Sequence, residues 1–309
     1  MAENSLKHRF LQGDALKALD KVDNNSCRLV ITSPPYNIGK EYERDRRRSL
    51  EEYVEWLKPI VEKACKKVAD DGHLCWQVGN YVNNGEVFPL DYYFYQMITA
   101  QGFRLRNRII WHFNFGLHAT KRFSGRYETL LWFTRSEKYH FNLESVRIPQ
   151  LYPGKRHSKG RAGKAGLPSG NPRGKNPSDF WVFDPEEALK NNAVWELPNV
   201  KANHPEKTFH PCQFPSELVE RCLLALTEQG DTILDPFVGV GTTVLAAAKH
   251  SRSAIGIDQS EKYLKLARKR LSDLRAGRLI TRPLGKPVRR PKAGERVATI
   301  PTEWKVAAE

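Results

Sequence analysis

The chain has 309 residues, 40% of them hydrophobic, so it can bury a sizeable core in one large domain or two small ones. Its formal net charge of +15 predicts a polyanionic partner, and an anionic membrane surface would also attract such a chain. No apolar run approaches the length of about 18 residues that spans a bilayer, and five cysteines without a C-x-x-C pair indicate reduced thiols in a cytoplasm rather than disulfides or zinc.

The first predicted strand, residues 8–12, leads into Gly13-Asp14 and a helix from Ala15 to Leu19. A second strand, residues 28–31, ends at Ser33-Pro34-Pro35-Tyr36, because consecutive prolines cannot continue a strand ladder. Pro-Pro by itself is typical of a plain corner. A rigid turn after a strand, with Ser33 and Tyr36 projecting from it, is also the usual place for a site in an open α/β sheet.

An arginine run follows at residues 44–48, where Arg46 and Arg47 are candidate phosphate contacts or simply a solvated surface. Ser49 and Glu52 form a predicted capping box, and the helix after them has apolar residues at helical spacing as far as Val68. Further along we expect strands and one helix, in the order: strand 73–78, helix 87–101, strand 104–113, strand 128–134. Arg122, between the last two strands, is another candidate phosphate contact.

The composition shifts at residue 145, and residues 150–179 are rich in Gly, Pro, Ser, Lys and Arg with almost no aliphatic side chains. A disordered linker is one interpretation. The concentration of basic residues favours a region that binds nucleic acid. Its candidate phosphate contacts are Lys155, Arg156, Lys159, Arg161, Lys164, Arg173 and Lys175.

A glycine-rich segment, Asp235 to Thr243, follows a predicted strand at residues 232–234 and opens a helix at residues 244–249. Such a turn lets a ligand approach the backbone and the N–H groups of the helix. The next strand, residues 254–257, ends in Asp258, a carboxylate at the spacing expected for ribose hydroxyls. The third glycine of a dinucleotide site is replaced by Val244, so we expect a nucleoside cofactor without a pyrophosphate.

These two motifs resemble those of the amino-directed DNA methyltransferases that use S-adenosylmethionine: residues 33–36 their catalytic motif, residues 235–243 their cofactor loop. The catalytic motif comes first, as in the permuted beta class, and the resemblance covers roughly residues 8–272. It implies an α/β, Rossmann-like methyltransferase fold that is circularly permuted. The implied parts are a catalytic half (1–144), a basic target-recognition insert (145–203), a cofactor-binding half (204–274) and a basic, flexible tail (275–309).

The resemblance also implies the roles of individual residues. The implied catalytic residues are Ser33, Pro34, Pro35 and Tyr36. Ser33 and the Pro34 carbonyl would accept hydrogens of the amino group, and Tyr36 would stack on a flipped base. The cofactor contacts would be Asp14, Ser33, Pro215, Asp235, Pro236, Phe237, Gly239, Gly241, Thr242 and Asp258. Asp14 is equally well placed to cap the helix after it. No metal is expected, because the histidines lack ligand-spaced partners.

The target base is the finer choice. Serine at position 33 and the pair Phe214-Pro215 favour cytosine N4 over adenine N6 within the resemblance. Pro211-Cys212-Gln213 matches the nucleophile tripeptide of cytosine-C5 enzymes, but it precedes the glycine loop and the chain has no Glu-Asn-Val, which disfavours that chemistry.

Two further alternatives are a methyltransferase acting on RNA or protein glutamine, and a catalytically dead DNA-binding module. The expected setting is the prokaryotic cytoplasm, with double-stranded DNA as partner and no membrane. A homodimer and a cognate restriction endonuclease are the other expected partners.

Overall fold

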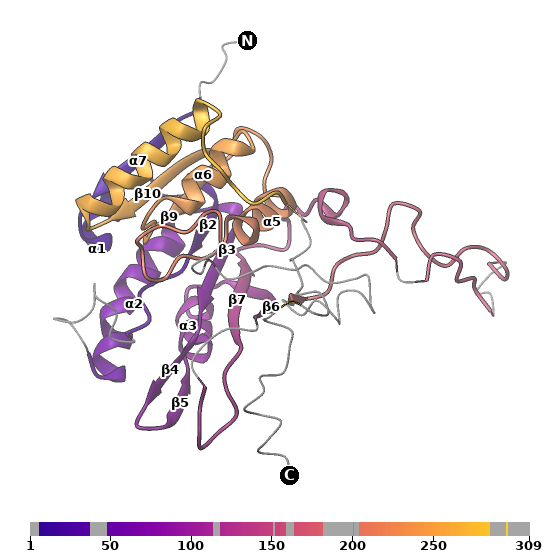
Figure 1. The fold of residues 1–309 in the computed structure, drawn as a ribbon, viewed down its shortest axis with the longest axis horizontal. Coiled ribbons are helices and arrows are strands. Elements are labelled where there is room, and N and C mark those ends of the chain that lie inside the picture. Colours follow the sequence, from indigo (N-terminus) through magenta and orange to yellow (C-terminus); the bar gives the residue numbers. More distant parts are fainter. Residues whose placement is uncertain are drawn as a thin grey trace.

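The computed structural model describes residues 6–37, 48–113, 118–150, 152–158, 164–181, 200, 204–284 and 295. Their core is an eight-stranded sheet with the order β1-β10-β9-β2-β3-β7-β6-β8 (Figure 1). The strands are β1 (His8–Gln12), β2 (Cys27–Thr32), β3 (Val68–Val78), β6 (Arg104–His112), β7 (Tyr127–Thr134), β8 (Phe180–Trp181), β9 (Thr232–Asp235) and β10 (Ser253–Asp258). The first five strands of that order are parallel, and β7 lies antiparallel between β3 and β6.

Helices cover both faces of this sheet, which makes a three-layer α/β/α arrangement. The helices are α1 (Ala15–Ala18), α2 (Leu50–Lys67), α3 (Leu90–Thr99), α5 (Ser216–Leu226), α6 (Thr242–Lys249) and α7 (Glu261–Arg275). Val30 of β2 packs with residues of α1 to α3, whereas its neighbours Leu29 and Ile31 pack with residues of α5 to α7. This alternation follows the period of two in a strand and explains why β2 is apolar on both faces.

The two halves implied by the sequence build one continuous sheet. Strand β2, from the first half, pairs with β9 from the second, with Leu29 opposite Ile233 and Val30 opposite Leu234. The expected mixed α/β fold with a mostly parallel sheet is confirmed. The boundaries proposed for the insert and the tail remain predictions.

Local signals placed α2 correctly. The Ser49 hydroxyl accepts from Glu52 N at 3.2 Å, and Ser49 N donates to the Glu52 carboxylate at 2.9 Å. This is the predicted capping box, which satisfies two backbone N–H groups at the start of the helix.

Two elements differ from the expectation. Strand β3 begins at Val68, and Gly72 lies within it at a register shift, where an added Cβ would approach the Arg28 carbonyl oxygen to 2.9 Å. Residues 87–89, expected to be helical, belong to a hairpin of β4 (Asn80–Asn83) and β5 (Glu86–Pro89). Its two-residue loop, Asn84-Gly85, has positive φ at both positions, the geometry of a type I′ turn.

The basic insert leaves the sheet and returns to it, and its described part extends away from the body of the molecule (Figure 1). Short antiparallel contacts join its two arms, at Ile148 with Lys175 and at Arg156 with Pro168.

The first residues after α7, where a flexible tail was expected, make buried contacts with the body of the protein. Arg282 is buried, its backbone N–H donates to the Glu206 carboxylate at 3.0 Å, and its guanidinium pairs with Glu217. Residues 285–294 and 296–309 lie outside the described part of the chain. Within the described residues, no helix is long and apolar enough to cross a bilayer.

Candidate active site

Parallel strands bring the predicted motifs together, because their carboxyl ends all meet at one edge of the sheet. Thr32 ends β2, Asp235 ends the adjacent β9, and Asp258 ends β10 beyond it. Gly13 follows β1 at the same edge, and its N–H donates to the Asp258 carbonyl oxygen at 3.0 Å.

Asp235 joins the two motifs through a buried hydrogen-bond network. Its carboxylate accepts from the Thr32 hydroxyl at 2.6 Å, from the Thr243 hydroxyl at 2.6 Å and from Phe237 N at 3.0 Å. Burial raises the pKa of Asp235 to about 6, although the hydrogen bonds from Thr243, Thr32 and Phe237 favour the charged form and lower it. Asp235 therefore links the end of β2, the glycine loop and the start of α6.

The glycine loop has the backbone that the sequence predicted. Gly239 and Gly241 have φ of 51° and 89°, which favour glycine. An added Cβ at Gly241 would lie 2.8 Å from the Ala267 Cβ of α7, and one at Gly239 would lie 3.3 Å from the His210 imidazole. Glycine is therefore required at both positions by the positive φ and by the close packing of the loop on Ala267 and His210.

Asp258 lies beside this loop, as the ribose interpretation requires. Its carboxylate accepts from Gly239 N at 3.0 Å and from Ser260 N at 2.7 Å. Burial raises its pKa, and these two backbone donors oppose that shift. A carboxylate held between two N–H groups at the end of a strand has the chemistry and the orientation to accept from vicinal hydroxyls. The residues present therefore fit a nucleoside such as the adenosyl part of S-adenosylmethionine.

The Pro-Pro turn carries a chain of hydrogen bonds. The Ser33 hydroxyl lies 2.8 Å from the Tyr36 hydroxyl, which donates to the Glu128 carboxylate at 3.2 Å. Gln77 donates to the same Glu128 oxygen. Glu128 and Gln77 come from β7 and β3, so two strands of the sheet support the turn.

Two contacts fix the shape of the turn. Tyr53 of α2 donates to the Pro35 carbonyl oxygen at 2.6 Å, and an added Cβ at Gly79 would lie 3.3 Å from the Tyr36 ring. Burial and the Glu128 charge raise the pKa of Tyr36 well above its usual value, so the phenol stays protonated and serves as a donor.

The other predicted cofactor residues have clear places. Asp14 accepts from Leu16 N at 3.1 Å and caps α1, which is the capping role expected of it. Pro236 is buried within the loop, and Thr242 is the first residue of α6. Phe237 packs edge-on against Trp56, with ring centroids 6.3 Å apart. Whether each of them contacts the cofactor remains a prediction.

The segment before α5 lies against the glycine loop. His210 packs on Tyr263 of α7 at 4.6 Å between ring centroids, and burial lowers its pKa to about 4. Pro215 is buried and caps α5, while Cys212 is exposed in the same segment. A neutral imidazole beside Gly239 is consistent with a lining of the cofactor site.

The predicted DNA contacts fall into three groups. Arg122, Lys155, Arg156 and Lys164 are exposed, and Arg156 donates to the Gly166 carbonyl oxygen at 2.6 Å. Arg173 pairs with Glu144 at 3.1 Å, and Lys175 pairs through its backbone with Ile148, so both lie at the base of the insert. Outside the described residues lie Arg46, Arg47, Lys159 and Arg161.

Sequence reasoning missed Thr32, Thr243, Tyr53, Gln77 and Glu128. Thr32 directly precedes the Ser33 turn and Thr243 ends the glycine-rich segment, so the position of both carried a signal. Tyr53 was assigned to the core because it lies on the apolar stripe of α2, and Gln77 and Glu128 are distant in sequence from the turn. Among the described residues, no group of three His, Cys, Asp or Glu side chains is arranged to hold a metal ion.

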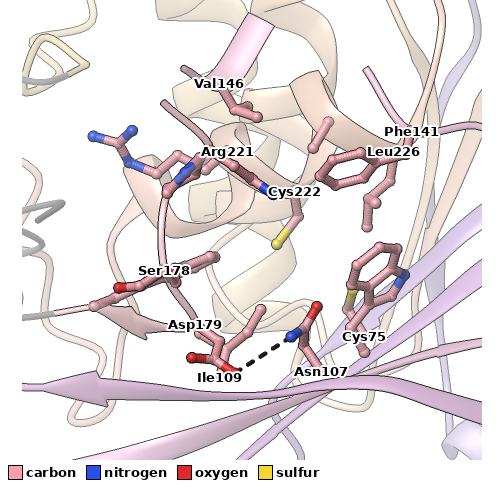
Figure 2. A pocket seen from close by; sticks show the side chains of 15 residues that line it. Cys75, Asn107, Ile109, Phe141, Val146, Ser178, Asp179, Arg221, Cys222 and Leu226 are labelled. Atoms are coloured by element: carbon pink, nitrogen blue, oxygen red, sulfur yellow. Dashed lines mark hydrogen bonds between the residues drawn. The ribbon is translucent and has the colours of Figure 1, made fainter. Parts of the chain in front are cut away.

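A cavity of about 130 Å³ lies elsewhere, between β6, β7 and α5 (Figure 2). Its lining includes Cys75, Cys222, Trp132 and Arg221, and Asp179 of the returning insert accepts from Asn107 across its floor at 3.4 Å. None of the predicted site residues lines it, so this cavity belongs to the packing of the insert on the sheet.

Several known proteins are similar to this chain in sequence or in structure. A sequence profile for the N6/N4 family, described as DNA methylase, matches residues 27–269. The chain is 42% identical over 266 residues to the type II methyltransferase M.BglII of Bacillus subtilis, covering 86% of this chain and 69% of the relative.

Two solved structures illustrate the shared fold. One is TTHA0409 of Thermus thermophilus, a protein titled a DNA modification methylase and complexed with S-adenosyl-L-methionine. It has a TM-score of 0.57 and 25% identity, covering 86% of this chain and 94% of that one. The other is the PvuII DNA methyltransferase, titled cytosine-N4-specific, with a TM-score of 0.62 and 20% identity, covering 88% and 93%.

Proposed function

The chain belongs to the N6/N4 family of S-adenosylmethionine-dependent DNA methylases, and we propose that it methylates the N4 amino group of cytosine in duplex DNA. The observation that carries this proposal is the Ser33 turn, hydrogen-bonded to Tyr36 and joined through Thr32 to the Asp235 of the glycine loop. In this proposal the Ser33 turn binds the base and the glycine loop binds the cofactor. The turn and the loop follow the carboxyl ends of two paired strands, β2 and β9.

The chemistry follows from what an exocyclic amino group needs. Its lone pair is delocalised into the ring, so the nitrogen is a weak nucleophile. Bound S-adenosylmethionine supplies a methyl group on a cationic sulfonium. The chain must place the base in line with it, which is catalysis by proximity, and must accept the amino hydrogens as the lone pair localises. Ser33 and the Pro34 carbonyl oxygen serve as acceptors in this proposal.

Cytosine is favoured over adenine by two features of the sequence. Serine occupies position 33, where the adenine-N6 enzymes of the family more often have aspartate. The pair Phe214-Pro215 also favours cytosine N4. A relative of solved structure that is titled cytosine-N4-specific is consistent with this choice. Adenine N6 is the alternative outcome, and identifying the methylated nucleoside distinguishes the two.

The basic surface supports duplex DNA as the substrate. Arg122, Lys155, Arg156 and Lys164 present exposed cations on the β6–β7 loop and on the projecting insert. Phe123, next to Arg122, is 98% exposed, and aromatic side chains beside cations can stack on unpaired bases. A target base must leave the stack to reach the Ser33 turn.

The relative M.BglII is named a type II methyltransferase. We therefore propose that this chain modifies a specific DNA sequence and protects it from a cognate restriction endonuclease.

Transfer from S-adenosylmethionine carrying a labelled methyl group tests the proposal. Purified wild-type chain is given unmethylated phage DNA, total RNA or a protein extract, with Ser33→Ala as the comparison. We expect label in DNA alone, and at least about a hundredfold less with Ser33→Ala. Label in RNA or protein but not in DNA would contradict the proposal.

A further inference from the structure

The donors and acceptors of the hydrogen bonds in the turn can be assigned by starting at Glu128 and continuing to Tyr36 and then Ser33. The Tyr36 hydroxyl donates its single hydrogen to the Glu128 carboxyl oxygen at 3.2 Å. The Tyr36 oxygen can then only accept from Ser33, 2.8 Å away. This consumes the single hydrogen of Ser33 and leaves only lone pairs on its oxygen for any further partner.

We propose that Glu128 is a positioning residue that fixes this direction, so that Ser33 meets the target base as an acceptor only. The proposal rests on the proposed function and deepens it. An exocyclic amino group presents hydrogens, whereas the carbonyl oxygen that replaces it in thymine or guanine presents lone pairs. The same turn would therefore accept amino-bearing bases and reject keto bases at the reacting position.

The residues around Glu128 support a fixed direction for the hydrogen bonds that join it to Tyr36 and Ser33. Gln77, which is 2% exposed, donates to the same Glu128 oxygen that accepts from Tyr36, so this oxygen is held as an acceptor from two sides. Strands β3 and β7 pair here, with Gln77 opposite Leu130 and Val78 opposite Thr129, and this pairing fixes both backbones. Glu128 acts through Tyr36 and Ser33 and does not itself touch the base.

A double-mutant cycle between Glu128 and Ser33 tests this role. The kcat for methyl transfer to unmethylated phage DNA is measured for wild type, Glu128→Ala, Ser33→Ala and the double variant. We expect Glu128→Ala to lower kcat about tenfold or more in the wild-type background, with the KM for S-adenosylmethionine unchanged. In the Ser33→Ala background the same change should matter less than about twofold, because the hydrogen bond it directs is already absent.

Three further variants serve as controls for the double-mutant cycle. Glu128→Gln should retain most of the activity, because Gln77 orients the new amide with its oxygen toward Tyr36; a loss equal to that of Glu128→Ala would contradict the proposal. Glu137→Ala removes a carboxylate that lies past the opposite end of β7 and pairs with Arg104 and Arg106; it should leave kcat unchanged. If Glu128→Ala does not fold, Tyr36→Phe takes its place, since it removes the same link and keeps the ring.

The outcomes separate the two proposals. If wild type transfers methyl groups to DNA but the losses from Glu128→Ala and Ser33→Ala multiply independently, the positioning role is overturned and the proposed function stands. If wild type transfers no methyl group to DNA, the proposed function itself fails.

Discussion

At the scale of single residues, burial changes the pKa of Asp235 strongly. It is fully buried, yet its carboxylate receives two threonine hydroxyls and one backbone N–H. These bonds only partly offset the loss of hydration, so its pKa is raised to about 6. Asp235 therefore binds a proton more readily in the folded than in the unfolded chain.

This shift predicts a pH dependence of stability. A raised carboxyl pKa stabilises the fold below the unfolded value of 3.8, and that contribution is lost as the pH rises through about 6. The upper limit of the loss is about 3 kcal/mol, from the shift at 1.36 kcal/mol per pKa unit. Asp235→Asn keeps one of the two acceptor oxygens and cannot titrate. Denaturant unfolding should therefore show the free energy of unfolding of wild type, relative to Asp235→Asn, falling between pH 4 and pH 6.5. A constant difference across that range would contradict the raised pKa.

At the scale of elements, the glycine loop between β9 and α6 is held by its contact with α7. Gly241 combines a φ of +89° with only 2.8 Å between an added Cβ and the Ala267 Cβ. Gly230, in the turn before β9, has the same φ of +89° but no atom within 4 Å of an added Cβ. The two glycines therefore separate backbone strain from close packing.

Alanine at each position should give different results. Gly230→Ala should destabilise the fold by about 1 kcal/mol through strain alone, and leave the affinity for S-adenosylmethionine unchanged. Gly241→Ala should cost about 2 kcal/mol or more, because α7 must also move, and should weaken cofactor binding at least about tenfold. Thermal unfolding and calorimetric titration of both variants measure these effects. Equal effects on cofactor affinity would contradict a role for the packing of the loop on α7.

At the scale of the whole molecule, the chain has a net charge of +15, and its described part consists of a body and a projecting insert (Figure 1). Lys155 and Lys164 are exposed on the insert. Lys265 and Lys269 are exposed on α7, which lies on the side of the body away from the insert (Figure 1). If the insert lies along DNA, only the first pair neutralises phosphates.

Replacement of Lys155 and Lys164 by alanine should therefore weaken DNA binding and reduce the slope of log K against log salt by about 2. The same change at Lys265 and Lys269 alters the net charge equally and should leave the slope unchanged. Fluorescence anisotropy across a salt series measures both. Equal slopes for the two double variants would place the phosphate contacts elsewhere.

How far the sequence predicted this molecule depends on where each signal lay. Contiguous motifs sufficed for the Ser33 turn, the glycine loop and Asp258, since strand ends and glycines with positive φ are local features. The fold class followed from the resemblance of these motifs to a known family, and their order indicated the circular permutation. The β4–β5 hairpin also had a local signal, Asn84-Gly85, which was overlooked beside the aromatic residues of α3.

Other features could not be read locally. Glu128 and Gln77 reach Tyr36 only because β3 and β7 pair, and that pairing joins residues about fifty positions apart. Arg282 looked like part of a basic tail because its partners, Glu206 and Glu217, lie more than sixty positions earlier. Long-range pairing of polar groups leaves no periodicity in a single sequence.

The central claim, methyl transfer to cytosine N4 from the Ser33 turn, is tested most directly by mass spectrometry of nucleosides. DNA from cells that express the chain is digested and compared with DNA from cells that express the Ser33→Ala, Tyr36→Ala variant. The account predicts N4-methylcytosine in the first sample and none in the second. N6-methyladenine in place of N4-methylcytosine would contradict the choice of base, and equal methylation by the variant would contradict the role of the turn.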